Sequence, residues 1–165
     1  LKTLLFASIN PISKDAEMDV LPLHVSITPA FNVEPRQNKE LSKRLKERVE
    51  RFNVFTIIGL EASLFGPEED IPVRKVGGVY LYEVHDAVLP VVKNVDKQFS
   101  MEYAGEQFSP HVTERANSVM REGERAIVNK LHLAQQDNTW RILESFDLKV
   151  PDPAMYQFDI YRTNV

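Results

Sequence analysis

The sequence predicts a single α+β domain made of two similarly built halves. Short apolar stretches rich in β-branched residues, which are typical of strands, occur together with two segments whose apolar residues recur at helical spacing. One three-residue pattern occurs twice, as His-Val-Ser at residues 24–26 and as His-Val-Thr at residues 111–113. No low-complexity tract or linker divides the chain, and 43% hydrophobic residues are enough to bury a core. We therefore expect one domain of two lobes spanning residues 1–165.

The first half should contain two strands and one helix. Residues 3–9 form an apolar run closed by an Asn-Pro pair, which indicates a buried strand and a turn. Residues 13–19 are polar and should form a loop, whereas residues 20–27 should form the strand that carries the first histidine. Over residues 38–52 the apolar side chains follow helical spacing, at Leu41, Leu45, Val49 and Phe52. The remaining Lys, Arg and Glu residues of this helix favour a solvated face over a nucleic-acid contact.

The second half should repeat these elements in another order. Residues 55–65 and 78–84 are rich in β-branched and aromatic residues and are predicted to be strands. Between them, residues 67–75 form an acidic and then basic segment, predicted to be a loop. Helical spacing returns over residues 86–99, with Pro90 expected in the first turn, where a proline is tolerated.

After the second histidine we expect a short helix and further strands. Residues 114–122 should form the helix, ended by Gly123. Residues 126–133 and 140–148 should pair as a hairpin around a polar turn. Residues 155–161 alternate aromatic and apolar with polar positions, which predicts a closing edge strand.

Composition excludes several classes of protein. A formal net charge of −4 disfavours a protein that coats long nucleic acids, although a small or terminal phosphate ester remains compatible. The chain has no cysteine and therefore no disulfide, which fits a reducing compartment, and we expect a cytoplasmic protein. No apolar run approaches a membrane span, and the first seven residues are too short and mixed for a signal peptide. A monomer without a cofactor is expected.

The repeated pattern carries chemistry of its own. In a strand, residues two apart point to the same side of the sheet, so His24 lies beside Ser26, and His111 beside Thr113. If the two strands come together, two imidazoles can share acid and base duty while two hydroxyls bind an anionic oxygen. Such a site could cleave a phosphodiester without a metal ion.

The two patterns, 87 residues apart, resemble the paired His-x-Ser/Thr-x tetrapeptides of the 2H phosphoesterase superfamily, nearest to its 2′-5′ RNA ligase and 2′,3′-cyclic phosphodiesterase group. The resemblance covers residues 4–148. It implies a bilobal fold with two antiparallel sheets, helices packed outside and pseudo-two-fold symmetry around a central cleft. It also implies metal-independent hydrolysis of a nucleotide or oligonucleotide phosphodiester, with His111 as base and His24 as acid. Reversing the direction of attack would exchange these roles. Ser26 and Thr113 would donate to the non-bridging phosphate oxygens.

Further residues are candidates for substrate binding. Arg115 follows Thr113 by two positions and could meet the phosphate if the strand continues that far. A nucleotide base in such a cleft would stack on an aromatic ring. The candidates are Phe31, Tyr82, Tyr103 and Phe108, each of which also fits a place in the core. His85 and His132 lack a hydroxyl two residues later and are interpreted as structural or exposed.

Three functions from different classes stay open. The first is the phosphodiesterase, acting on a 2′,3′-cyclic phosphate, a 2′-5′ linked oligonucleotide or a cyclic nucleotide, with 2′-5′ RNA ligation as the reverse of the same chemistry. The second is an RNA-end binding module that uses the same cleft without turnover. The third is an unrelated α+β protein in which the two patterns match by chance. No P-loop, Rossmann glycine pattern or Gly-x-Ser-x-Gly elbow occurs, and the histidines have no recognisable metal-ligand spacing.

Overall fold

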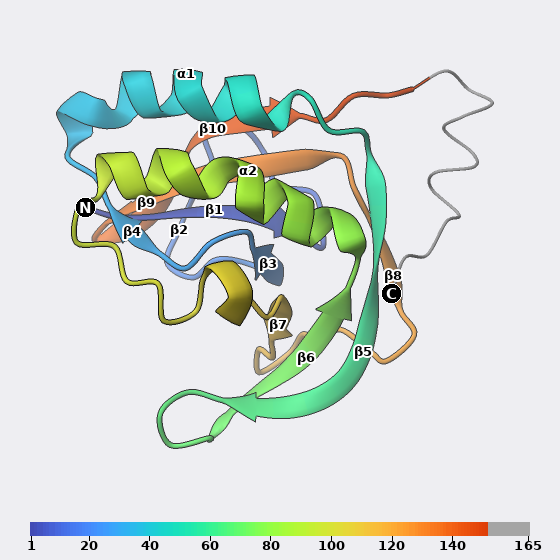
Figure 1. Cartoon of the computed structure of the whole chain (residues 1–165). Helices are drawn as coiled ribbons and strands as arrows, with labels where there is room; N and C mark the ends of the chain where they lie inside the picture. Colours follow the sequence, from blue (N-terminus) through green and yellow to red (C-terminus); the bar gives the residue numbers. More distant parts are fainter. Residues whose placement is uncertain (152–165) are drawn as a thin grey trace.

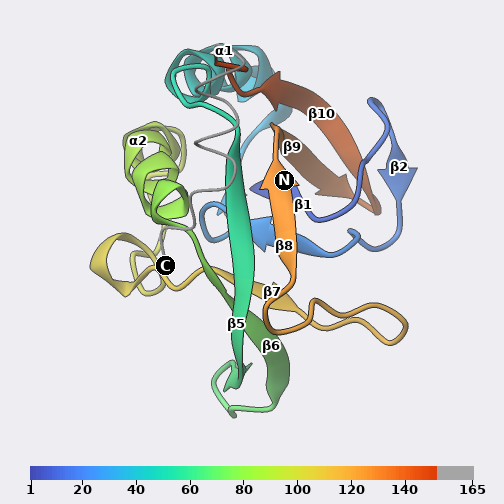
Figure 2. The same cartoon turned by 90° about the vertical axis from the view of Figure 1, so that its right-hand side faces the viewer.

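A computed structural model describes residues 1–151 of the chain as an α+β fold, with two helices packed on one face of a ten-stranded sheet (Figure 1). The view turned by 90° shows both helices on the same side of the strands (Figure 2). The helices are α1 (Asn38–Val49) and α2 (Val79–Val95), with short 3-10 turns η1 (Pro35–Gln37) and η2 (Gly105–Gln107). The strands are β1 (Lys2–Ser8), β2 (Glu17–Met18), β3 (His24–Ser26), β4 (Phe31–Asn32), β5 (Phe55–Phe65), β6 (Ile71–Gly77), β7 (His111–Thr113), β8 (Arg125–Val128), β9 (Lys130–Asp137) and β10 (Thr139–Asp147).

The sheet consists of two halves that meet at β3 and β7. Its strand order is β2-β10-β9-β1-β3-β7-β6-β5-β8, with β4 paired to β1. The paired strands run antiparallel, and β3 joins β7 through the pair Val25 and Val112. The two antiparallel sheets expected for the lobes are therefore continuous through this junction.

The two faces of the sheet bury different clusters. Leu5 and Ala7 of β1, with Val25 and Val112, pack in the large core beneath α1 and α2. The alternate residues of β1, Leu4 and Phe6, point the other way, because successive side chains of a strand face opposite sides. They form a second apolar cluster with Leu21, Ala134, Trp140 and Ile142 on the face that carries no helix.

Much of the element order follows the sequence pattern. The predicted helix over residues 38–52 is α1, whose Leu41, Leu45 and Val49 are buried. The strands predicted at residues 3–9 and 55–65 are β1 and β5, and the predicted hairpin includes β9 and β10. Its turn residue Asn138 has a positive φ of 65°, a conformation that asparagine tolerates better than most residues.

Other predictions were wrong between residues 67 and 99. Residues 79–84 form the first turns of α2 and not a strand, because Leu81, Val84 and Val88 continue the helical spacing and pack in the core. Their burial outweighs the strand preference of β-branched residues. The predicted loop at 67–75 contains most of β6, which pairs with β5. Pro90 lies inside α2 at an exposed position and not in the first turn, because the helix already begins at Val79.

Smaller corrections concern elements near the histidines. The first histidine's strand is limited to residues 24–26, and β2 lies within the expected loop at 13–19. Residues 114–122 form no helix; a bridge between Arg115 and Ser118 gives a turn instead. The edge strand predicted at 155–161 lies outside the described residues.

A glycine is required at position 59, where β5 passes close to the backbone of residues 121–124. Its N–H donates to the Glu124 carbonyl and its carbonyl accepts from the Gly123 N–H, both at 2.8 Å. A Cβ here would overlap with the carbonyl oxygen of Arg121. Gly59→Ala should therefore lower the free energy of unfolding by about 2–3 kcal/mol, measured by urea denaturation. Gly123→Ala meets no atom within 4 Å and should cost only about 1 kcal/mol for its positive φ; equal losses would contradict this account.

Candidate functional site

The two histidine patterns lie side by side on the face of the sheet that carries no helix. β3 and β7 are neighbours, as Figure 1 shows below α2. Val25 and Val112 are paired and buried in the large core. Side chains alternate along a strand, so the four flanking side chains, those of His24, Ser26, His111 and Thr113, point to the opposite face. All four residues are half-buried.

The antiparallel register places the histidine of each pattern near the hydroxyl residue of the other. One step from the pair of Val25 and Val112 brings His24 towards Thr113, and one step the other way brings Ser26 towards His111. Each imidazole therefore neighbours the hydroxyl of its own strand and the hydroxyl of the other. Two antiparallel strands paired at one residue are related by a local two-fold axis, which is the symmetry that the repeated pattern implied.

Both imidazoles are held in the same way by the backbone. The Nδ1–H of His24 donates to the Pro22 carbonyl at 2.7 Å, and that of His111 donates to the Ser109 carbonyl at 2.8 Å. Because a carbonyl oxygen only accepts, the neutral ring must carry its proton on Nδ1. The Nε2 atom of each neutral ring is then an acceptor, able to take a proton from a reacting group.

The surroundings of His24 favour its neutral form. Its ring lies edge-on to Phe6, with ring centroids 5.1 Å apart. Burial lowers the pKa of His24, and the positive charges of Arg115 and His111 lower it further, against the opposing effect of the Pro22 hydrogen bond.

Arg115 lies beside the first histidine. Arg115, His24 and Ser26 line one pocket of about 370 Å³, which extends along β1 to Lys2 and Trp140. The Nε of Arg115 is buried and has no hydrogen-bond partner among residues 1–151. A buried donor without a partner is costly, and the guanidinium of Arg115 brings a positive charge to the lining of this pocket.

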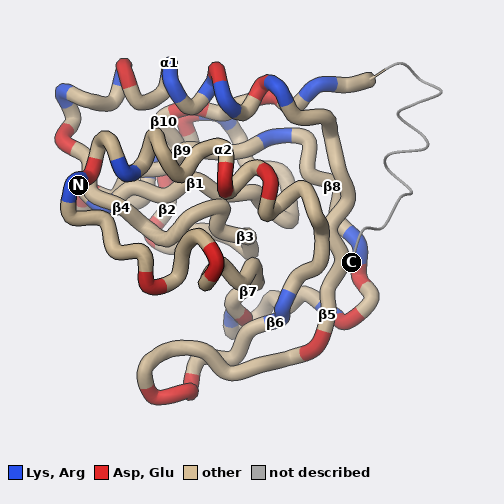
Figure 3. The backbone as a smooth tube through the Cα atoms, in the orientation of Figure 1, with Lys and Arg blue, Asp and Glu red and all other residues tan. Residues whose placement is uncertain are grey.

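The sequence analysis did not single out two residues next to His111. Lys75 of β6 is the register partner of His111, so its side chain points to the same face. Phe65 of β5 packs edge-on against the His111 ring, with centroids 4.6 Å apart. Both lie on the β5–β6 hairpin, which the prediction of a loop at 67–75 had hidden. Its turn carries the acidic cluster Glu68, Glu69 and Asp70 (Figure 3).

Comparisons with known proteins give structural matches only. No protein-family model matches the sequence, and no curated protein does. The fold is similar to that of TT0787 from Thermus thermophilus, with a TM-score of 0.62, 15% identity, and coverage of 89% of this chain and 97% of that chain. It is also similar to a phosphoesterase, with a TM-score of 0.62, 14% identity, and coverage of 90% and 98%. Against Escherichia coli LigT complexed with 3′-AMP the TM-score is 0.61, with 14% identity and coverage of 90% and 98%.

The chain has the fold of LigT. LigT is a 2′-5′ RNA ligase of the 2H phosphoesterase superfamily, and its structures include complexes with 3′-AMP, NADP⁺, phosphate and ATP. The resemblance inferred from the two histidine patterns is thereby confirmed for the fold.

The aromatic candidates for substrate binding lie elsewhere in this LigT-like fold. Phe31 is buried in the large core, with 1% of its surface exposed, and cannot stack on a substrate base. Tyr82 contacts Phe108 at 5.6 Å between ring centroids, and Phe108 stacks on His85 of α2. Tyr103 is exposed next to η2. None of the four lines the pocket of His24 and Arg115. Phe31 and Phe108 are buried, as the core alternative for these residues expected, whereas Tyr82 and Tyr103 are exposed.

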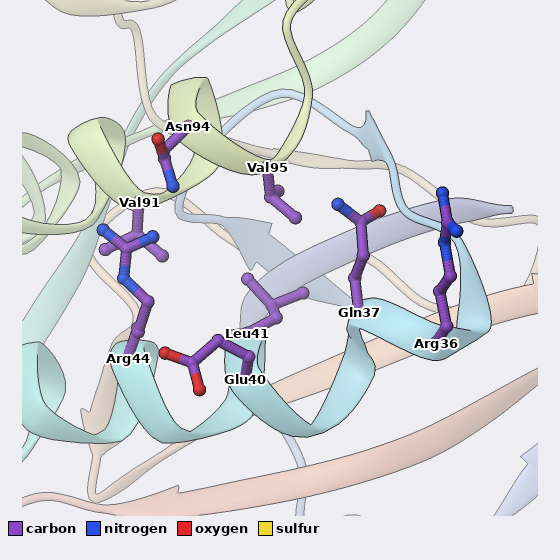
Figure 4. Close-up of a pocket in the computed structure, with 8 residues that line it drawn as sticks. All are labelled: Arg36, Gln37, Glu40, Leu41, Arg44, Val91, Asn94 and Val95. Atoms are coloured by element: carbon purple, nitrogen blue, oxygen red, sulfur yellow. The ribbon is translucent and has the colours of Figure 1, made fainter.

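The described residues also bear on other kinds of site. Within residues 1–151, no group of three or more His, Cys, Asp or Glu side chains is arranged to hold a metal ion. No helix in this range is long and apolar enough to cross a membrane. A separate pocket of about 440 Å³ lies between α1 and α2, and Arg44 and Asn94, two of its lining residues, point towards each other from the two helices (Figure 4). It contains no residue of the histidine patterns.

Two histidines with lowered pKa values should make stability depend on pH. Burial lowers the pKa of His24 and of His132, so both rings resist protonation in the folded state. In the unfolded chain they take up protons near pH 6.5. Below that pH the unfolded state binds more protons, so the free energy of unfolding should fall as the pH is lowered from 7 towards 5.

The measurement is the melting temperature as a function of pH. The double variant His24→Gln/His132→Gln should lose less of its melting temperature between pH 7 and pH 5 than the unmodified protein loses. An unchanged pH slope in the double variant would show that these two rings are not the cause.

Proposed function

We propose that the protein is a metal-independent phosphodiesterase that hydrolyses a 2′,3′-cyclic phosphate, a 2′-5′ linked oligonucleotide or a cyclic nucleotide. The observation that carries the proposal is the pairing of β3 and β7, which sets two imidazoles and two hydroxyls on one face of the sheet. The LigT fold adds support, since LigT is complexed with 3′-AMP and with phosphate in its structures. The phosphate of the substrate would lie between the two histidine patterns.

The mechanism uses one histidine as base and the other as acid. The base takes a proton from the attacking water as its oxygen bonds to phosphorus. The bond between phosphorus and the leaving ribose oxygen breaks, and the acid gives that oxygen a proton. Ser26 Oγ and Thr113 Oγ1 donate to the non-bridging oxygens, where negative charge increases in the transition state. Arg115 adds a positive charge at the same oxygens.

The environment of the rings favours one assignment of these roles. A base must be neutral before reaction, and the lowered pKa of His24 favours its neutral form. We therefore assign His24 as base and His111 as acid in the free protein. This is the opposite of the assignment that the family resemblance implied for cyclic-phosphate hydrolysis.

The negative charge of the protein favours a small substrate. The acidic turn of the β5–β6 hairpin follows Phe65, which contacts the His111 ring. The three carboxylates of this turn and the net charge of −4 would both repel a long polyanion. We expect mononucleotides or short oligonucleotides to be better substrates than structured RNA.

The experiment that tests the function is a substrate panel in EDTA-containing buffer. It contains 2′,3′-cyclic mononucleotides, 2′-5′ oligoadenylates, 3′-5′ cyclic dinucleotides and RNA ends with a cyclic phosphate. Chromatography should separate 2′- from 3′-phosphate products. Hydrolysis of none of these substrates, combined with tight binding of RNA ends, would favour the binding module. Formation of a 2′-5′ linkage from paired RNA ends would favour ligation.

Removing either imidazole should abolish most hydrolysis without unfolding the protein. His24→Ala and His111→Ala should each lower kcat by about 10²–10⁴-fold, because each loses one proton-transfer group. His132→Gln is the matched control, since His132 is buried and bonded to Ser145 on the same sheet yet lies outside the two patterns. Full activity in either alanine variant would refute the assignment.

The pH dependence of kcat/KM tests the role of His24 as base. The acid limb should lie below pH 6.5, because burial and the charge of Arg115 lower the pKa of His24. Arg115→Gln removes that charge, so the limb should move to higher pH while KM rises. Arg121→Gln, an exposed arginine outside the pocket, should leave the limb in place. A limb that Arg115→Gln does not move would contradict this assignment.

A further inference from the structure

His85 of α2 connects the two histidine strands from the opposite side of the sheet. We propose that it is a positioning residue, which fixes the distance and orientation of the two patterns for the reaction. This inference rests on the proposed function for its catalytic readout. His85 is 1% exposed and lies in the helix layer, so it does not contact the substrate.

The ring of His85 forms one hydrogen bond to the residue after β3 and one to the segment that precedes β7. Its Nδ1–H donates to the carbonyl of Ile27 at 2.7 Å, and Ile27 directly follows Ser26. Its Nε2 accepts from the Gly105 N–H at 2.9 Å, at the start of η2. The ring also stacks on Phe108, with centroids 3.9 Å apart and planes 2° from parallel. One side chain thus joins the end of β3 to the segment that leads into β7.

The second contact continues to the His111 ring. Phe108 is followed by Ser109, whose carbonyl accepts the hydrogen bond from His111 Nδ1–H. A shift of η2 would therefore move the group that orients His111. The first contact acts in the same way on Ser26, because Ile27 is held on both sides: its N–H donates to the Leu5 carbonyl of β1, and its carbonyl accepts from His85.

The two histidine strands pair directly over few residues, so a second connection through His85 can affect how they are positioned. β3 and β7 have three residues each, and their register consists of the one pair Val25 and Val112. Each strand has three register pairs with its other neighbour, β3 with β1 and β7 with β6, so the direct contact between the two histidine strands is the shortest of these pairings. A second connection through a rigid ring on a helix restricts relative movement of the two strands, and misplacement by about 1 Å can cost 10²-fold in rate.

Both hydrogen bonds of His85 require one protonation state. The Ile27 carbonyl needs a donor, and the Gly105 N–H needs an acceptor, so the ring is neutral with its proton on Nδ1. A glutamine amide also offers one donor and one acceptor, whereas a phenylalanine ring can stack on Phe108 but can make neither hydrogen bond. These two substitutions separate the hydrogen bonds from the packing.

The test compares His85→Phe and His85→Gln on the best substrate of the panel. His85→Phe should lower kcat by about 10–100-fold with less than a threefold rise in KM, because the substrate still binds but the two imidazoles are misaligned. His85→Gln should recover kcat to within about threefold of the unmodified protein. His132→Gln, which also removes a buried, hydrogen-bonded histidine, should lower the melting temperature without changing kcat.

The imidazole nitrogen chemical shifts of His24 and His111 give a readout that does not need turnover. In the folded His85→Phe variant the ¹⁵N shifts of His111 should change, and inorganic phosphate should bind more weakly by ³¹P NMR. Unmodified kcat and His111 shifts in His85→Phe would overturn the proposal, as would equal losses of kcat in the two His85 variants. Absence of hydrolysis in the unmodified protein, with the NMR changes present, would reject the phosphodiesterase function and leave the positioning role standing.

Discussion

The structure depends on one antiparallel contact, in which Val25 of β3 lies opposite Val112 of β7. This pair joins the two halves of the sheet, and both valines are buried beneath the helices. Because neighbouring side chains on a strand point to opposite faces, burying the two valines turns four polar side chains to the other face. A slip of one residue in β3 would bury His24 and Ser26 in the core, so the hydrophobic effect itself sets the register of the site.

The rings of His24 and His111 have similar backbone hydrogen bonds but different surroundings. Both imidazoles donate from Nδ1 to a carbonyl two residues earlier in the chain. His24 is buried against Phe6 and lies near Arg115, whereas His111 packs on Phe65 and has Lys75 as its strand partner. Two histidines can act as acid and base when one is neutral and the other protonated, and the lowered pKa of His24 favours its neutral form. The local two-fold repeat provides the pair of groups, and the elements around it make the pair unequal.

The spacing of apolar residues predicted an element correctly where one face of that element is buried in the core. The stripe of Leu41, Leu45 and Val49 predicted α1, and apolar runs predicted β1 and β5. It failed at residues 79–84, where β-branched residues belong to a helix whose burial decides its conformation. It failed again at β6, where exposed and half-buried positions, two of them charged, gave a pattern typical of a loop. In both cases contacts distant in the sequence outweigh local propensity.

The sequence by itself determined which chemical groups are available: two imidazole and hydroxyl pairs, each on one side of its strand, and an arginine shortly after the second pair. Only the tertiary structure decided that the two pairs share one face, that Arg115 lies beside His24, and that Phe31 belongs to the core. Periodicity reports which way a side chain points relative to its own strand. The partner of that strand is fixed by packing between residues far apart in the chain, and no local pattern contains that information.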